Sequence, residues 1–153
     1  MLKPKISICI PTYNRADSLA NCLQSIVTAA KDHVGKFEVC VSDNGSDDAT
    51  NNIVLEAMEL LEITYHRNDT NLGIPRNFIK VVSLAKGEFV WLIGDDDLLL
   101  PDTFDRLLPL LDNNKGIDFF YLNSFYLDRS YIESHTYPFD TRKLPLKMEP
   151  FSK

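Results

Sequence analysis

The chain has 153 residues, and its 44% hydrophobic and 25% charged residues are typical of a globular domain. A chain of this length can bury one core without disulfides or a structural metal. Its 16 Lys+Arg and 22 Asp+Glu give a formal net charge of −6, and no basic block stands out against that background. We therefore expect no nucleic-acid polymer among its partners.

Neither a membrane span nor an export signal is visible in the sequence. The apolar run of residues 89–93 is far shorter than the ~20 residues that a membrane helix needs. Cys9, Cys22 and Cys40 lie in apolar patterns without CxxC or CxxH spacing, so we interpret them as buried, reduced thiols. These features predict a cytoplasmic protein whose membrane association is at most peripheral, at the inner face of the membrane.

Two strand-helix units open the chain. Residues 6–10 form a β-branched run that Pro11 ends, and a helical stripe follows at Leu19, Cys22, Leu23, Ile26, Val27 and Ala30. Residues 37–42 repeat the strand pattern. The next helix is predicted to begin with Ser46 as its N-cap, and its buried face consists of Ile53, Val54, Ala57, Met58 and Leu61.

Two further units and one more strand follow. Residues 62–66 predict a third strand, and a third helix closed by Gly87 is marked by Phe78, Val81, Val82 and Ala85. Residues 89–93 are apolar at every position, which predicts a fourth strand covered on both faces. Pro101 and Asp102 then open a fourth helix, whose inward-facing residues are predicted to be Phe104, Leu107, Leu108 and Leu111. After this helix, residues 117–122 predict a fifth strand.

The alternation of strands and helices predicts an α/β fold, with an open, mainly parallel sheet and helices on both faces. Such sheets bind ligands beyond the carboxyl ends of their strands, at the point where the strand order reverses. Three polar segments follow predicted strands, at residues 11–14, 43–48 and 94–97. We expect these segments to converge on one crevice.

Three acidic residues, Asp95, Asp96 and Asp97, come directly after the fourth strand. Like charges this close repel one another, so we expect a cation beside them. Mg²⁺ or Mn²⁺ typically takes one or two carboxylates and completes its shell with water and substrate phosphates. The plainer alternative is that Asp96 and Asp97 only begin a loop and cap the next helix.

The segment at residues 43–46 has two interpretations. It can be a plain turn, or Asp43 can accept hydrogen bonds from a nucleotide, because it follows the second strand of a doubly wound sheet. The chain has no GxGxxG and no GxxxxGK[ST] motif, so it lacks both the dinucleotide fingerprint and the P-loop. A metal at the aspartates is then the means of holding phosphates, and Tyr13 offers a ring face to a base or ribose.

Four motifs together resemble the inverting family 2 glycosyltransferases, which have the GT-A fold. The motifs are ICIPTYNR at 8–15, EVCVSDNGSDD at 38–48, RN at 67–68 with NLG at 71–73 and RN at 76–77, and WLIGDDD at 91–97. The GDDD version, together with IPRN at 74–77, is most similar to bacterial transferases that build O-antigen and capsule repeats, including abequosyltransferase-like enzymes. The resemblance covers residues 6 to about 111.

The resemblance implies a site for a nucleoside-diphosphate sugar. Asp43 would hydrogen-bond the base, and Arg76 would approach the diphosphate or the base. The nucleoside pocket would be lined by the first polar segment. The complete implied set for the nucleotide sugar is Pro11, Thr12, Tyr13, Asn14, Asp43, Arg76, Asp95 and Asp96.

The resemblance also implies a divalent metal, Mn²⁺ or Mg²⁺. In the Asp-x-Asp signature, Asp95 would contact the ribose or sugar and Asp97 would bind the metal. Asp95 is also an implied metal ligand, and Asp96 is the neighbouring alternative. Because three acids stand in a row, this assignment is ambiguous by one position.

The implied reaction is a displacement at the anomeric carbon, in which an acceptor hydroxyl attacks and the nucleoside diphosphate leaves with inversion. The acceptor would be a saccharide or a lipid-linked saccharide. The attack needs a general base, which family members often place in a Glu-Asp pair beyond the fifth strand. No such pair follows Gly116, so the base is unknown and is expected beyond Lys153.

The chain therefore resembles the donor-binding part of a longer protein, truncated at its C-terminal end. We expect residues 1–125 to form the nucleotide-sugar-binding GT-A domain. Residues 126–153 would begin an acceptor-binding region or form an irregular tail. This part alone would bind a nucleotide and transfer nothing.

Two other functions remain open at this stage. A nucleotidyltransferase also combines an α/β sheet with acidic metal ligands, but such enzymes generally have a Gly-rich, basic first loop, and residues 12–15 are not one. A noncatalytic nucleotide-binding or scaffold module would use its acids only for solubility. Calorimetry with nucleoside diphosphates, with and without Mn²⁺, distinguishes these alternatives.

Overall fold

The structure, a computed structural model, describes residues 3–122, 124–127 and 133–134. The chain forms two compact units, Met1–Asn113 and Asn114–Lys153. In the second unit, β5 (Tyr126–Leu127) pairs antiparallel with β6 (Glu133–Ser134). The domain boundary expected near residue 125 stays a prediction. Within the described part of the chain, no helix is both long and apolar enough to cross a membrane.

The first unit is built on a parallel sheet. Its strands are β1 (Ile6–Thr12), β2 (Phe37–Asp43), β3 (Ile63–Arg67) and β4 (Phe89–Leu92), in the order β3-β2-β1-β4. Every residue of β1 and β2 is buried, because these central strands are covered on both faces. The open parallel sheet is confirmed.

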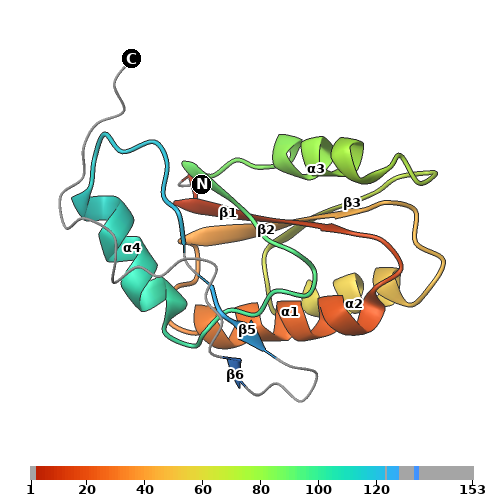
Figure 1. The fold of residues 1–153 in the computed structure, drawn as a ribbon, viewed down its shortest axis with the longest axis horizontal. Coiled ribbons are helices and arrows are strands. Elements are labelled where there is room, and N and C mark those ends of the chain that lie inside the picture. Colours follow the sequence, from red (N-terminus) through yellow and green to blue (C-terminus); the bar gives the residue numbers. More distant parts are fainter. Residues whose placement is uncertain (1–2, 123, 128–132, 135–153) are drawn as a thin grey trace. The chain divides into compact units, whose positions relative to one another are not determined.

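Helices cover both faces of this sheet. In Figure 1, α3 lies above the sheet and α1 and α2 lie below it. The helix bounds are α1 (Ala16–Ala30), α2 (Thr50–Ala57), α3 (Ile74–Ser83) and α4 (Thr103–Asn113). α4 packs against α1, and its Phe104 ring stacks on Phe37 with the ring centroids 4.7 Å apart.

Side-chain periodicity explains which face each helix buries. The stripe predicted for α1 is buried at Leu19, Cys22, Leu23, Ile26 and Ala30. On the opposite side of the sheet, Val81 of α3 packs against the neighbouring pair Cys9 and Cys40. All three cysteines are buried and free, as expected.

The start predicted for the second helix is wrong. α2 begins at Thr50, because the backbone N–H of Ser46 donates to Asp43 at 2.8 Å and keeps Ser46 in the preceding turn. The helix also ends at Ala57, which leaves Met58 exposed and places Leu61 in the core beyond the helix.

The end predicted for the third helix is wrong as well. α3 ends at Ser83, so Gly87 does not close it. Gly87 lies against β1 instead, where a Cβ would stand 2.7 Å from both the backbone nitrogen and the Oγ of Ser7. Phe78 and Val82, predicted to face inward, are exposed.

Two strand predictions also differ from the structure. β4 is not covered on both faces, since Val90 is 47% and Leu92 44% exposed. These side chains share the sheet face of Cys9, but α3 packs over β1 and β2. Residues 117–122, predicted as a fifth strand, belong to no strand in the described part of the chain, because an apolar run gives strand propensity without fixing regular strand geometry.

Candidate functional site

The strand order places a switch point between β1 and β4. From β1 the chain proceeds through β2 to β3 on one side, and then returns to the other side as β4. Ligands of such sheets bind beyond the carboxyl ends at this point. Here the Thr12 hydroxyl, at the end of β1, donates to Asp95 Oδ2 at 2.8 Å. The segments that follow β1 and β4 therefore meet at the switch point.

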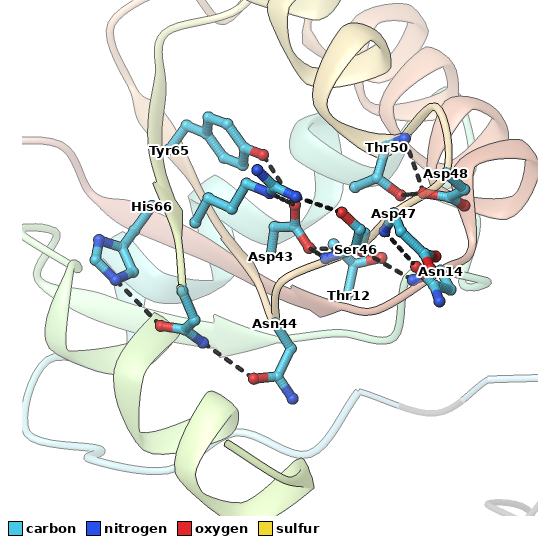
Figure 2. A network of polar contacts seen from close by, with 12 residues as sticks. Thr12, Asn14, Asp43, Asn44, Ser46, Asp47, Asp48, Thr50, Tyr65 and His66 are labelled. Atoms are coloured by element: carbon cyan, nitrogen blue, oxygen red, sulfur yellow. Dashed lines mark hydrogen bonds and ion pairs between the residues drawn. The ribbon is translucent and has the colours of Figure 1, made fainter. Parts of the chain in front are cut away.

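The segments after β1 and β2 also meet. The Asn14 N–H donates to Ser46 Oγ at 2.8 Å, and the Asp47 N–H donates to Asn14 Oδ1 at 2.9 Å (Figure 2). Asn14 has a φ of 52°, a left-handed conformation that Asn adopts more readily than most residues. All three polar segments are thus joined by hydrogen bonds, so their predicted convergence is confirmed.

Asp48 fixes the starts of two helices at once. Its Oδ2 accepts a hydrogen bond from the Ala16 N–H of α1 at 3.0 Å, and its Oδ1 accepts one from the Thr50 N–H of α2 at 3.0 Å. Burial raises the pKa of Asp48, but the hydrogen bonds from Thr50 and Ala16 outweigh it and leave the pKa below the ordinary value of 3.8. The charged carboxylate is therefore the form that the fold favours.

Asp43 is fully buried, and protein groups already surround its carboxylate. Oδ1 accepts hydrogen bonds from the backbone N–H and the hydroxyl of Ser46, and Oδ2 accepts one from the Tyr65 hydroxyl at 3.0 Å (Figure 2). Arg67 Nε lies 3.3 Å from the same Oδ2. A carboxylate has about four lone-pair positions, and these four contacts fill them. Burial and the neighbouring Asp43 charge raise the pKa of Tyr65, so its hydroxyl stays a donor.

Buried asparagines connect β2, β3 and α3. The Asn68 amide donates to Asn44 Oδ1 and to Asn77 Oδ1, both at 3.1 Å. Asn77 also accepts from the Ser42 hydroxyl at 2.7 Å and donates to the Ser42 carbonyl at 2.9 Å. Sequence reasoning missed the role of Asn77. The available signal was its spacing, four residues before Val81 on the buried stripe of α3.

The three aspartates have different surroundings. Asp95 is only 5% exposed, and the Arg15 side chain lies 3.2 Å from its Oδ1 through Nε and 2.7 Å from Asp96 Oδ2 through Nη2. Asp97 Oδ2 accepts a hydrogen bond from the Gly94 N–H at 2.7 Å. Burial raises the pKa of Asp95, and the Thr12 hydroxyl and the Arg15 charge oppose that rise. The cation expected beside these acids is, in this structure, Arg15.

The remaining predicted residues line the same edge of the sheet. Pro11 is buried in β1, whereas the Tyr13 ring is 41% exposed. Arg76 is exposed in the first turn of α3. Among the described residues, no group of three or more His, Cys, Asp or Glu side chains is arranged to hold a metal ion. The carboxylate oxygens of Asp95 and Asp97 have the chemistry that Mg²⁺ and Mn²⁺ prefer, and one or two carboxylates suffice for an ion that also binds substrate phosphates.

The comparison with protein families decides the assignment. The model of glycosyl transferase family 2 matches residues 7–150. The chain belongs to glycosyltransferase family 2. The matched region includes all three polar segments and Arg15.

Both curated relatives and solved structures of other proteins are similar to this family 2 chain. It is 42% identical over 114 residues to the abequosyltransferase RfbV of Salmonella typhimurium. The matched region covers 73% of this chain and 34% of RfbV. The structure of S. aureus TarS 1-349 in complex with UDP-GlcNAc matches with a TM-score of 0.67 and 30% identity, over 71% of this chain and 31% of that one. These matches confirm the GT-A fold.

A third match was solved with a metal. It is the mannosyltransferase PcManGT from Pyrobaculum calidifontis in complex with GDP-Man and Mn²⁺, with a TM-score of 0.59 and 28% identity over 68% of this chain and 31% of that one. The chain thus spans about a third of the length of these three proteins.

Proposed function

We propose that this chain is the donor-binding part of an inverting glycosyltransferase that acts in bacterial surface polysaccharide synthesis. The observation that carries the proposal is the hydrogen bond between Thr12 and Asp95. It places the acidic motif at the switch point of the sheet, in a family 2 chain that is 42% identical to an abequosyltransferase. The donor is a nucleoside-diphosphate sugar, in keeping with the UDP-GlcNAc and GDP-Man bound in two of the matched structures.

The nucleoside is proposed to bind above the ends of β1 and β2. The exposed ring of Tyr13 is available to stack on the base or ribose, and Pro11, Thr12 and Asn14 are proposed to line the nucleoside pocket with it. Asp43 is proposed to contact the base. Because its four lone-pair positions are filled, this contact requires Tyr65 or Arg67 to release Oδ2.

The diphosphate is proposed to lie between the aspartates and α3. Arg76 is exposed in the first turn of α3, where a long cationic side chain is able to reach a phosphate. Asp95 and Asp97 are the proposed ligands of Mn²⁺ or Mg²⁺, and Asp96 is the neighbouring acid. When bound, the ion would act as a Lewis acid that stabilises the charge on the leaving diphosphate.

The reaction itself is proposed to be a single displacement. The acceptor hydroxyl forms a bond to the anomeric carbon as the bond to the diphosphate breaks, and a general base takes the hydroxyl proton. We propose that this base lies beyond Lys153 and that the acceptor is a saccharide or lipid-linked saccharide. The proposed location is the cytoplasm, at the inner face of the membrane.

Isothermal titration calorimetry tests the donor site. CDP, UDP and GDP are titrated into the chain with and without Mn²⁺, and the corresponding triphosphates serve as comparison. We expect one diphosphate to bind in a metal-dependent manner and more tightly than its triphosphate. Preference for a triphosphate would favour a nucleotidyltransferase, and no binding heat with any nucleotide would favour a scaffold.

Asp97→Asn is the variant that assigns the acid. The asparagine oxygen still accepts the hydrogen bond from Gly94, so the turn keeps its shape while the charge is lost. Metal-dependent binding should disappear without a change in melting temperature. Asp102→Asn is the matched control, because Asp102 is an acid outside the Asp95–Asp97 motif and is paired with Arg106. Normal binding by Asp97→Asn would refute the metal assignment.

The transfer reaction requires the full-length protein. Incubation with a nucleoside-diphosphate sugar and a lipid-linked saccharide should give a product whose anomeric configuration, measured by NMR coupling constants, is opposite to that of the donor. Retention of configuration would exclude the single displacement.

A further inference from the structure

Arg15 makes contacts that the proposed reaction does not yet use. Its guanidinium bridges two carboxylates, with Nε 3.2 Å from Asp95 Oδ1 and Nη2 2.7 Å from Asp96 Oδ2. Such a bridge neutralises charge that would otherwise be repulsive at the switch point. The same two carboxylates belong to the motif that we propose for the donor and its metal.

The parts of this bridge differ in their freedom to move. Asp95 is 5% exposed and is held by the Thr12 hydroxyl, so its oxygens are fixed. The backbone beside Arg15 is also held, because the next N–H, that of Ala16, donates to Asp48. The Arg15 side chain is 48% exposed. The Arg15 guanidinium is therefore the group that can move away from the aspartates, while the backbone beside it stays in place.

A divalent ion and the guanidinium compete for the carboxylate of Asp95. Two cations within a few ångströms repel each other strongly in a partly buried site, so the ion binds to Asp95 only when Arg15 moves away. A guanidinium that loses two carboxylates needs another anion, and its planar fork suits a phosphate. The donor's diphosphate would be such an anion beside the aspartates.

We propose that Arg15 is the counter-cation of Asp95 and Asp96 in the absence of a metal. A divalent ion then displaces the Arg15 guanidinium, which moves to pair with the phosphates of the donor. This inference rests on the proposed function. It makes Arg15 a positioning residue with opposite effects on two ligands. It weakens the binding of the metal alone, because the metal must break the bridge, and it strengthens the binding of the nucleotide once the metal is present.

Two titrations of the full 153-residue chain test this proposal at a fixed ionic strength of 0.15 M. Mn²⁺ alone is titrated and the free ion is followed by its EPR signal, and CDP, UDP and GDP are titrated at saturating Mn²⁺ by calorimetry. Arg15→Met should bind Mn²⁺ alone about tenfold more tightly, or ~1.4 kcal/mol, and should bind the preferred diphosphate about tenfold more weakly. Arg15→Lys keeps the charge and should restore the weak Mn²⁺ binding of the unsubstituted chain.

Controls separate this effect from a general loss of charge or fold. Arg106→Met removes an exposed arginine that pairs with Asp102, and it should change neither titration. Thermal melting by circular dichroism should show that Arg15→Met stays folded. Equal Mn²⁺ affinity of Arg15→Met and the unsubstituted chain would overturn the displacement, and unchanged diphosphate affinity would overturn the phosphate contact. If neither protein bound Mn²⁺, the proposed metal site would fail, and this inference with it.

Discussion

Asparagine in place of Asp43 tests whether this acid mainly holds the turn together. The substitution keeps the size of the side chain but removes its charge and converts one acceptor oxygen into a donor NH₂ group. If the amide oxygen stays with Ser46, the NH₂ group faces Arg67 Nε, which can only donate, and the Tyr65 hydroxyl, which must turn its proton away in order to accept. The Arg67 contact is then lost, and the charge-assisted bond with Tyr65 becomes a weaker neutral one.

The expected cost follows from these contacts. A hydrogen bond to a charged acceptor contributes ~1.5–3 kcal/mol and a neutral one ~0.5–1.5 kcal/mol, so the part-buried bond with Tyr65 loses about 1–2 kcal/mol. Arg67 is half-exposed, so its contribution is discounted to below about 1 kcal/mol. We therefore expect Asp43→Asn to lower the free energy of unfolding by about 1–3 kcal/mol. Tyr65→Phe removes the charge-assisted bond itself and should lower the free energy of unfolding by about 1.5–3 kcal/mol.

Urea unfolding followed by far-UV circular dichroism measures both effects. The m value should stay constant, and at an m value of ~2 kcal/mol/M the midpoint of Asp43→Asn should fall by about 1 M. In the double variant, the two losses should not add, because both act on the same hydrogen bond. A change below about 0.5 kcal/mol for Asp43→Asn would refute the reasoning. The carboxylate would then be available to a nucleotide base without any rearrangement.

Three further predictions concern the frame of the site. Asn77→Leu should lower the free energy of unfolding by about 3 kcal/mol in urea titrations, because it removes the acceptor of the buried Ser42 hydroxyl and of the Asn68 amide; a stability unchanged or raised would contradict this. Asp48→Asn should cost about 1 kcal/mol at pH 7. Because the native pKa of Asp48 lies below the unfolded value of 3.8, its contribution is complete above about pH 4 and is lost as the pH falls through the native pKa. The variant and the unsubstituted chain should therefore converge in melting temperature in acid, and a constant difference would argue against a role for the charge. Gly87→Ala should lower the melting temperature by several degrees through the clash with Ser7, whereas Gly116→Ala, where a Cβ meets nothing within 4 Å, reports the cost of the positive φ alone.

The sequence was sufficient to predict the sheet, because each strand is followed by a helix with its own apolar period. The same periodicity gave the buried stripe of α1. It also gave the order of the polar segments, since every one of them follows a strand. Their convergence then follows from parallel topology alone. None of these inferences requires knowledge of a contact between distant residues.

The predictions that failed depend on such contacts. Ser46 has the right chemistry for an N-cap, but a buried acceptor three residues earlier binds it more favourably. Gly87 is a residue type that often ends helices, but here it allows the chain to pass close to Ser7, which is 80 positions away in the sequence. The pairing of Arg15 with Asp95 joins residues of two different strand ends. Local patterns carry no information about these distances.

Because Asp48 and Ser46 hold the segment after β1, the two segments behave as one hydrogen-bonded unit. Exchange of a single segment between relatives would leave the N-terminus of α1 or the backbone of Asn14 without its acceptor. Engineering of donor preference in this fold should therefore transplant residues 12–16 and 43–50 together. Chimaeras that take residues 12–16 from one parent and residues 43–50 from another are expected to fold poorly, even when every residue is native to one of the parents.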